Sequence, residues 1–192
     1  MKLVFATNNL NKLKEVTNLI KNQIEVVNLN DINCNEDILE TENTISGNAI
    51  LKANYIKTNY GFDCFADDTG LEVDFLNGNP GVFSKRFAGE NSTDELNMQK
   101  LLNDMKEANN RNAKFKTVIA LNIDNKVTTF TGICEGEILT KKRGANGFGY
   151  DPIFLPKGYK KSFGEMNLIE KNKIAHRSKA VKKLINYLNN YC

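Results

Sequence analysis

The sequence predicts an α/β fold, because short apolar runs typical of strands alternate along the chain with segments whose apolar residues recur at helical spacing. Two further observations favour a single unit. Hydrophobic residues make up 41% of the 192 residues, which is enough to bury a core without a metal or a disulfide, and we find no internal repeat, low-complexity tract or clear linker. We therefore expect residues 1–192 to form one α/β domain.

The first part of the chain predicts a strand, a polar turn and a helix. Residues 3–6 are apolar strand formers, residues 7–9 interrupt them, and apolar residues recur at helical spacing from 13 to 20. Residues 24–29 predict a second strand and residues 31–43 an acidic loop. Residues 48–60 predict a second helix, and residues 64–66 a brief strand that ends at Asp67-Asp68-Thr69-Gly70 before alternation resumes at 71–73.

The second part begins with a turn at residues 77–81, which contain Gly78, Pro80 and Gly81. Residues 94–107 predict a helix, and residues 114–139 predict a strand pair around a turn at 124–126. A glycine-rich loop follows at 144–150, and residues 164–191 predict a final helix.

The charge pattern excludes several classes of protein. Lys and Arg number 26 against 23 Asp and Glu, and the net charge of +3 is dispersed along the chain, so we expect neither nucleic-acid nor membrane binding. The four cysteines form no CxxC pair, which excludes a zinc knuckle or dithiol motif. Without a secretory signal pattern or an apolar run of about 20 residues, the sequence predicts a cytoplasmic protein.

The first candidate site is the turn Thr7–Lys12, between a predicted strand and a predicted helix. Backbone N–H groups and the positive end of a helix dipole meet at such a turn, and Lys12 adds a full charge, so the turn is suited to phosphate. The alternative is that the Thr and Asn side chains only cap the helix, since the glycines of a P-loop are missing.

The second candidate is the pair Asp67-Asp68. Adjacent carboxylates repel one another unless a cation relieves them, and their hard oxygen atoms suit Mg²⁺. Paired acids in a solvated turn are the alternative. We expect this pair to lie close to the phosphate-binding turn, because ligands gather at the carboxyl ends of strands in one sheet.

Charged residues near the second helix could assist this pair. Glu40 and Glu42, in the acidic loop, could supply another metal ligand. Lys52 lies in an otherwise apolar helical stretch, where it is either solvated or a second group that neutralises phosphate.

Two other segments are suited to a nucleotide base. Glycines flank Phe148 in the segment 147–152, so the backbone can approach a ligand while the ring offers a face for stacking; a buried aromatic turn is the alternative. His176 and Arg177, preceded by Lys171, offer donors that could read the 6-oxo group of a purine, and an exposed basic helix is the alternative.

Six motifs follow one another along the chain: ATNNLNK near the start, NAILKA at 48–53, FADDTGLEV at 65–73, NPGVFSKRFAG at 79–89, GFGYDPIF at 147–154 and HRSKA at 176–180. In this order and approximate spacing they resemble the inosine triphosphate pyrophosphatase family over essentially the whole chain. The resemblance implies an elongated mixed β-sheet with helices forming two lobes around a central substrate cleft, and a homodimer. It also implies hydrolysis of ITP, dITP and XTP to the nucleoside monophosphate and pyrophosphate.

The resemblance further implies roles for individual residues. Asp68, Lys12 and Lys52 match catalytic positions, Asp68 as base or metal ligand and the two lysines through phosphate. The matched substrate-binding positions are Thr7, Asn8, Asn9, Leu10, Asn11 and Lys12 for the triphosphate, Thr69 beside Asp68, Phe148, Gly149, Tyr150 and Asp151 for base and sugar, and Lys171, His176 and Arg177 for the 6-oxo purine.

We expect Mg²⁺ as cofactor, bound by Asp68 and Glu40. Leu39-Glu40-Thr41-Glu42 stands where many relatives have a Glu-Glu-Thr-Gly-like stretch, so Asp67 and Glu42 remain alternatives for the second ligand. The sequence does not decide whether Ser84, Lys85 and Arg86 contact substrate or a partner subunit. Two other functions stay open: a nucleotide-binding sensor without turnover, and a pyrophosphatase for another modified nucleotide.

Overall fold

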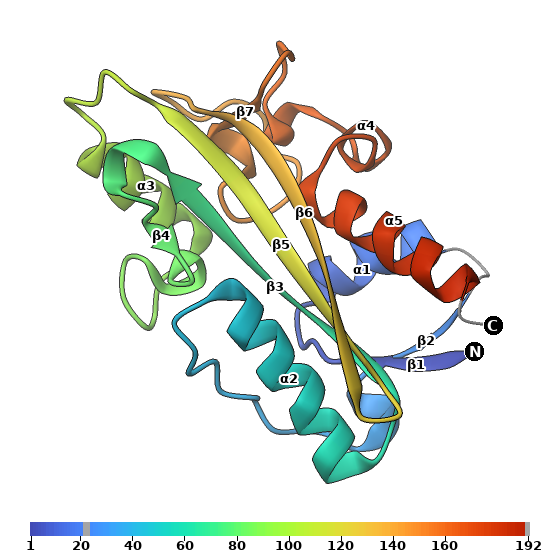
Figure 1. Cartoon of the computed structure of the whole chain (residues 1–192). Coiled ribbons are helices and arrows are strands. Elements are labelled where there is room, and N and C mark those ends of the chain that lie inside the picture. Colours follow the sequence, from blue (N-terminus) through green and yellow to red (C-terminus); the bar gives the residue numbers. More distant parts are fainter. Residues whose placement is uncertain (21–23, 191–192) are drawn as a thin grey trace. The chain divides into compact units, whose positions relative to one another are not determined.

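The computed structural model describes residues 1–20 and 24–190. Within them, seven strands form one mixed sheet in the order β2-β1-β3-β5-β6-β7, with β4 paired to β3 (Figure 1), so the expected mixed α/β fold is confirmed. Tertiary contacts define two compact units. Unit 1 comprises Met1–Asp68, Thr117–Gly132 and His176–Cys192, and unit 2 comprises Thr69–Lys116 and Ile133–Ala175. Each unit is described by itself.

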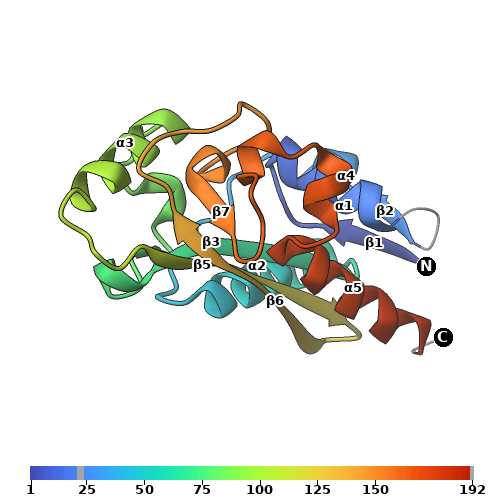
Figure 2. The same ribbon diagram turned by 90° about the horizontal axis from the view of Figure 1, so that it is seen from above.

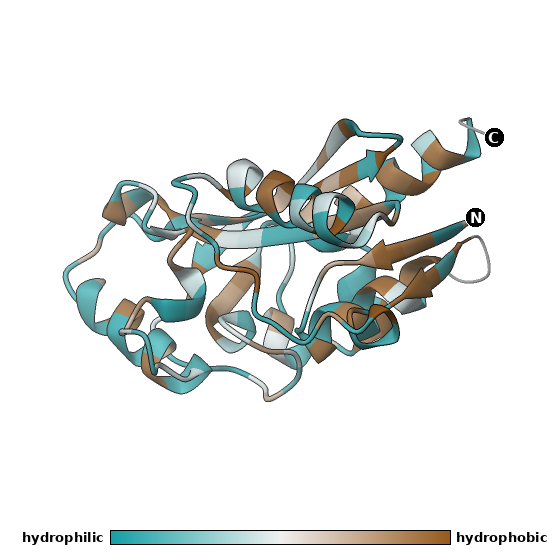
Figure 3. Ribbon diagram, turned by 90° about the horizontal axis from the view of Figure 1, so that it is seen from below, coloured by the Kyte–Doolittle hydropathy of each residue, from teal (hydrophilic) through white to brown (hydrophobic). Residues whose placement is uncertain are grey.

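The parallel part of the sheet lies in unit 1. Strand β1 (Lys2–Phe5) pairs in parallel with β2 (Glu25–Val27) and with the start of β3 (Cys64–Val73), where Phe5 is opposite Phe65. Three of the four residues of β1 are buried, and the strand is brown along most of its length beside the N label in Figure 3. Burial on both faces explains why this strand is continuously apolar instead of alternating.

Three helices complete unit 1: α1 (Leu10–Ile20), α2 (Ile45–Tyr60) and α5 (His176–Asn189). Helices α1 and α5 pack against each other (Figure 1), and their apolar faces share one core with β1 and β3, including Val16, Phe65 and Val181. Helix α2 begins three residues before the expected position because Thr44 caps it by accepting a hydrogen bond from the backbone N–H of Gly47.

Strands β5 (Asn112–Ile123) and β6 (Lys126–Ile138) form the expected strand pair and run side by side in Figures 1 and 2. Asp124 and Asn125 join them with φ values of 50° and 62°, the left-handed conformation that a two-residue hairpin turn requires. Near the turn, in unit 1, Gly132 lies so close to α5 that a Cβ there would be 2.6 Å from the backbone nitrogen of Ala180. Gly132 therefore permits close packing of α5 on β6.

Unit 2 contains α3 (Asp94–Asp104), α4 (Leu168–Asn172) and the short strands β4 (Pro80–Gly81) and β7 (Phe154–Pro156). Its core contains an aromatic cluster: the Phe115 and Phe154 rings meet edge to face with centroids 4.7 Å apart, and the Phe154 and Phe163 centroids are 5.1 Å apart. Helix α3 ends three residues before the expected end, and β4 and β7 are too short for the sequence pattern to reveal.

Two expectations about local structure are wrong. Asp67-Asp68 does not end a strand, because β3 continues through both residues to Val73. The parallel pairing with β1 does stop at Phe65, whose carbonyl accepts from the N–H of Ala6, so the two acids still follow the end of the parallel ladder.

The expected helix at 164–191 is also broken, into a 3₁₀ turn (Phe163–Glu165), α4 and α5. Two capping boxes account for the break, because Ser162 with Glu165 and Asn167 with Glu170 each start a separate short helix. Tyr191 lies outside the described residues.

Cys34, Cys64 and Cys134 are buried and reduced, and Cys192 lies outside the described residues. Burial raises the pKa of Cys64 to about 12, which makes its thiol a poor nucleophile. None of the helices in residues 1–20 and 24–190 has both the length and the hydropathy needed to cross a bilayer.

Candidate active site

The turn between β1 and α1 caps the helix, which was the alternative to phosphate binding for this segment. The side-chain Oδ1 of Asn9 accepts hydrogen bonds from the backbone N–H of Asn11 at 3.0 Å and of Lys12 at 3.1 Å. The hydroxyl of Thr7 accepts from the N–H of Asn9 at 3.2 Å. The cap gives the turn a defined geometry at the positive end of α1, so it is compatible with the phosphate interpretation as well.

Lys12 extends from this turn to Asp67. Its Nζ lies 3.0 Å from Asp67 Oδ1, and only 14% of the Lys12 side chain is exposed. The other oxygen of Asp67 accepts a 3.0 Å hydrogen bond from Nε of Arg177, whose Nη1 in turn donates to Glu15. A buried chain of four charges, which we call the Asp67 network, therefore links α1, β3 and α5 within unit 1.

The Asp67 network changes the acidity of its members. Burial raises the pKa of Asp67, but Lys12, Arg177 and Lys52 together lower it more, and the net pKa lies well below the ordinary range. Burial lowers the pKa of Lys12, and Asp67 opposes this only in part. Asp67 is thus held as a carboxylate, whereas Lys12 loses its proton more easily than an exposed lysine.

Asp68, the neighbouring residue, belongs to a second cluster in unit 1. Nζ of Lys52 lies 4.0 Å from Asp68 Oδ1, and it donates to Glu40 Oε1 at 2.5 Å and to the Asp67 carbonyl at 2.7 Å. Nδ2 of Asn48 lies 3.4 Å from the other oxygen of Asp68. Lys52 is 7% exposed, so the solvated alternative for this lysine is wrong.

Two carboxylates in this second cluster converge on one cation, since Asp68 and Glu40 both lie within ion-pair distance of the same ammonium group. Their hard oxygen atoms and their convergence fit Mg²⁺. Residues 1–20 and 24–190 contain no group of three or more His, Cys, Asp and Glu side chains placed to hold a metal. Two carboxylates suffice for Mg²⁺ that keeps several waters and also binds substrate phosphates.

In unit 2 the predicted base-binding segment has its own buried ion pair. Nζ of Lys171 donates to Asp151 Oδ2 at 2.6 Å, and both side chains are at most 4% exposed. The same oxygen accepts from the backbone N–H of Phe148 at 3.0 Å, and Nζ of Lys171 lies 5.0 Å from the Phe148 ring centroid. Gly147 has a φ of 78°, and a Cβ there would collide with Asp151, so glycine is required for this turn.

Two neighbouring contacts hold the rest of this segment. The N–H of Gly149 donates to Asp94 Oδ2 at 2.6 Å, and the hydroxyl of Tyr150 donates to the Ser84 carbonyl at 2.8 Å. The Ser84 hydroxyl accepts from the N–H of Leu71 and donates to the Gly81 carbonyl. Ser84 therefore supports the local structure of unit 2.

The structure thus places the predicted residues in two groups. Unit 1 brings Lys12, Lys52, Asp68 and Glu40 together with Asp67, and unit 2 brings Asp151, Lys171 and Phe148 together. Thr69, next to Asp68 in β3, is half-buried.

His176 and Arg177 are 3% and 1% exposed at the start of α5, so the alternative of an exposed basic pair is wrong. Sequence reasoning missed two contributors in unit 1. Glu15 lies one turn after Lys12 on α1, and Asn48 lies one turn before Lys52 on α2, so helical spacing from the two lysines could have revealed them.

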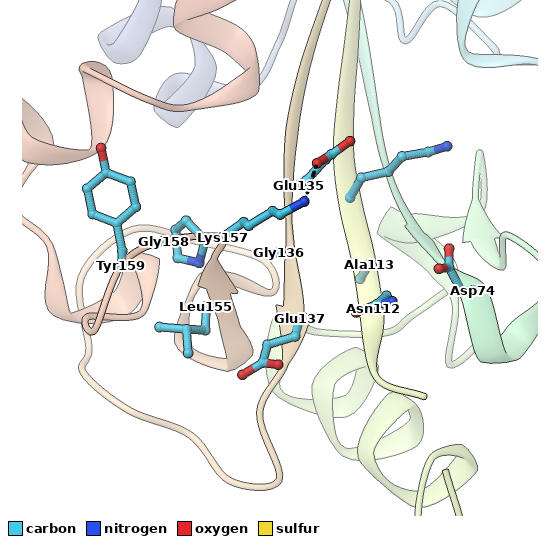
Figure 4. A pocket seen from close by; sticks show the side chains of 12 residues that line it. Asp74, Asn112, Ala113, Glu135, Gly136, Glu137, Leu155, Lys157, Gly158 and Tyr159 are labelled. Carbon is cyan, nitrogen blue, oxygen red and sulfur yellow. Dashed lines mark hydrogen bonds and ion pairs between the residues drawn. The ribbon is translucent and has the colours of Figure 1, made fainter. Parts of the chain in front are cut away.

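Unit 2 also contains a surface pocket of about 580 Å³ that none of the predicted site residues lines (Figure 4). Its wall includes Asp74, Glu137 and Tyr159, and Lys157 forms a 3.5 Å ion pair with Glu135 across it. Lys157 and Glu135 are exposed, which distinguishes this pocket from the buried ion pairs described above.

Comparison with known proteins identifies the family. The model of the Ham1 family matches residues 3–187. The chain belongs to the Ham1 family. It is similar to the dITP/XTP pyrophosphatase of Christiangramia forsetii, with 58% identity over 98% of this chain and 99% of that protein, and to that of Flavobacterium psychrophilum, with 57% identity over 99% and 100%. Among solved structures, the Ham1 protein of Staphylococcus aureus matches with a TM-score of 0.91 and 36% identity over the full length of both chains. These matches confirm the resemblance predicted from the six motifs.

Proposed function

We propose that this Ham1-family chain hydrolyses the deaminated purine nucleotides ITP, dITP and XTP to the nucleoside monophosphate and pyrophosphate. The observation that carries the proposal is the convergence in unit 1 of Lys12 and Lys52, from different helices, on the adjacent acids Asp67 and Asp68. The relatives named dITP/XTP pyrophosphatase support the substrate class.

The reaction breaks the anhydride bond between the α- and β-phosphates and adds the oxygen of water to phosphorus. Negative charge develops on the departing pyrophosphate, so preorganised cations supply most of the stabilisation. We assign this role to Lys12 and Lys52, and we assign to the turn Thr7–Asn11 the binding of the triphosphate at the positive end of α1. Asp67 holds Lys12 in the site before substrate arrives, so this lysine needs little reorganisation.

We propose Asp68 and Glu40 as the residues that would hold Mg²⁺. The metal, when bound, would neutralise phosphate charge and acidify a bound water. Asp67 is the poorer candidate for a ligand because Lys12 and Arg177 contact its two oxygen atoms at 3.0 Å each. Lys52, which now bridges Glu40 and Asp68, would turn toward a substrate phosphate.

The base and sugar are assigned to Phe148, Gly149, Tyr150 and Asp151 with Lys171. The Lys171–Asp151 pair fixes a cation within 5.0 Å of the Phe148 ring centroid, which is a suitable support for a stacked base. For the 6-oxo group we retain His176 as a donor. Arg177 also belongs to the predicted donors, but its contacts with Asp67 and Glu15 favour a role in holding the phosphate side of the site.

Product analysis tests this function. The purified chain with Mg²⁺ is incubated separately with ITP, dITP, XTP, ATP and dTTP, and the products are separated by anion-exchange chromatography. We expect monophosphate and pyrophosphate from the first three nucleotides at much higher rates than from ATP or dTTP. Diphosphate with phosphate would contradict the proposal, tight binding without turnover would indicate a sensor, and preference for dTTP would indicate another base specificity.

The assembly and location are also part of the proposal. A homodimer that works in the cytoplasm follows from the family resemblance, and sedimentation velocity of the full chain tests the dimer. A single boundary at about 21.6 kDa would contradict it.

A further inference from the structure

The acidic loop (residues 31–43) is fastened to α2 by a carboxylate that lies outside the site described above. One oxygen of Glu36, Oε1, accepts a hydrogen bond from the Tyr55 hydroxyl at 2.8 Å and from the Tyr60 hydroxyl at 2.7 Å. The two phenols hold the pKa of Glu36 below its ordinary value, Tyr60 more than Tyr55. We call these three residues the tyrosine clasp.

The tyrosine clasp is one end of a regular series of contacts. The N–H of Glu42 donates to Asn48 Oδ1 at 2.9 Å, Glu40 accepts from Lys52, and Glu36 accepts from the two tyrosines. Residues 42, 40 and 36 of the loop thus meet positions 48, 52 and 55 of α2 in order, so the loop runs antiparallel to the helix. Positions 48, 52 and 55 share one helical face, because residues three and four apart are neighbours.

The lengths of the two segments agree with this arrangement. The helix rises about 10 Å between Asn48 and Tyr55 and about 18 Å between Asn48 and Tyr60, at about 1.5 Å per residue. Six residues of loop span at most about 20 Å when extended, so the loop is long enough to follow the helix to either tyrosine. With the Glu42 end and the Glu36 end both attached, Glu40 is held in the stretch above Lys52.

We propose that the tyrosine clasp is a positioning element that lowers the Mg²⁺ concentration needed for activity by holding Glu40 beside Asp68. This inference rests on the proposed function, in which Glu40 and Asp68 hold the metal. Neither tyrosine touches the reacting atoms in this proposal; their hydroxyls act through the loop.

The test replaces both hydroxyls in the variant Tyr55→Phe/Tyr60→Phe, which keeps the aromatic rings. We expect the Mg²⁺ concentration for half-maximal ITP hydrolysis to rise about tenfold, because the two lost hydrogen bonds are solvent-exposed and together shift an equilibrium by about that factor. At saturating Mg²⁺, kcat and the KM for ITP should stay within about twofold of the parent, since Lys12 and Lys52, which we assign to the phosphates, are unchanged. Tyr159→Phe, at a half-exposed tyrosine in unit 2, is the matched control and should change none of these values.

A second readout does not depend on activity. Backbone amide exchange at Glu42 in the metal-free protein should accelerate in the double variant and not in the control, because the loop opens more often. The Glu42 exchange rate of Glu36→Gln, which keeps an acceptor oxygen, should lie between the rates of the parent and of Glu36→Ala. An unchanged Mg²⁺ requirement in the double variant overturns the inference, even if exchange accelerates. Failure of the parent chain to release pyrophosphate from ITP would instead overturn the proposed function and leave the exchange result interpretable.

Discussion

Replacement of Arg177 by Met should destabilise the protein strongly, because it leaves two carboxylates in the interior without their shared cation. Arg177 is 1% exposed and contacts both Asp67 and Glu15. Removing one partner of a buried ion pair costs about 3–5 kcal/mol. For a chain of this size, 1 kcal/mol corresponds to about 2–4 °C in Tm, so we expect Tm to fall by about 6–20 °C in circular dichroism melts.

The pH dependence of this loss has a definite sign. The folded-state pKa of Asp67 is depressed, so its ionisation contributes stability above the unfolded-state pKa, and that contribution is lost as pH falls through the folded-state value. Without Arg177 the depression is smaller, because Arg177 is one of the cations that lower the pKa of Asp67. The difference in Tm between parent and variant should therefore stay constant from about pH 7 down to the unfolded carboxyl value of about 4, and it should narrow as pH falls further.

Lys182→Met, at an exposed position on the same helix, is the matched control and should shift Tm little. If Arg177→Met were as stable as this control at every pH while its preference for ITP over ATP collapsed, the structural role of Arg177 in the Asp67 network would be wrong. That result would indicate that Arg177 contacts the purine base and that, in solution, it does not form the ion pairs of the Asp67 network.

Three other predictions follow from the structure. Asp68→Asn should lower kcat for ITP by several orders of magnitude, measured as pyrophosphate release, while equilibrium dialysis still detects nucleotide binding, because the lost charge acts on the reaction more than on the bound ground state. In a pH profile of kcat/KM for ITP, the alkaline decrease should begin below the usual lysine pKa of 10.5, because burial lowers the pKa of Lys12 and the neutral amine no longer attracts phosphate. Lys12→Arg should move this alkaline decrease to higher pH. Gly132→Ala should destabilise the fold by about 1–3 kcal/mol in urea titration, because a Cβ collides with the backbone of α5.

Each of these predictions has an outcome that opposes it. Near-normal turnover of Asp68→Asn would remove Asp68 from the mechanism. An alkaline limb that stays in place in Lys12→Arg would assign the titration to another group. An unchanged urea midpoint for Gly132→Ala would show that α5 can move away from β6 without cost.

Much of the fold was accessible from sequence because local chemistry and tertiary context agree there. The apolar run of β1, the helical spacing of α1 and the Asp124-Asn125 turn each satisfy a local rule that the fold also requires. The prediction of one helix at 164–191 was wrong because the periodicity of apolar residues does not reveal capping boxes. Ser162 and Asn167 each begin a new helix.

The site was accessible in its residue types more than in its contacts. The proximity of the two acids to Lys12 and Lys52 could be expected from the carboxyl ends of strands in one sheet. The contact of Arg177 with Glu15 joins residues that are 162 positions apart, and no spacing in the sequence predicts it. Burial of Arg177 was equally hidden, because arginine is mostly exposed in folded proteins.

The balance of charge around Asp67 and Asp68 has a consequence for which nucleotides can enter. Three cationic side chains (Lys12, Lys52 and Arg177) meet four carboxylates (Glu15, Glu40, Asp67 and Asp68), so the resting region carries no surplus of positive charge. A bare polyphosphate would be repelled by the excess carboxylate, whereas one accompanied by a divalent ion brings its own compensation. Under the proposed function, we therefore expect this region to bind a metal-complexed nucleotide more readily than a free inorganic anion.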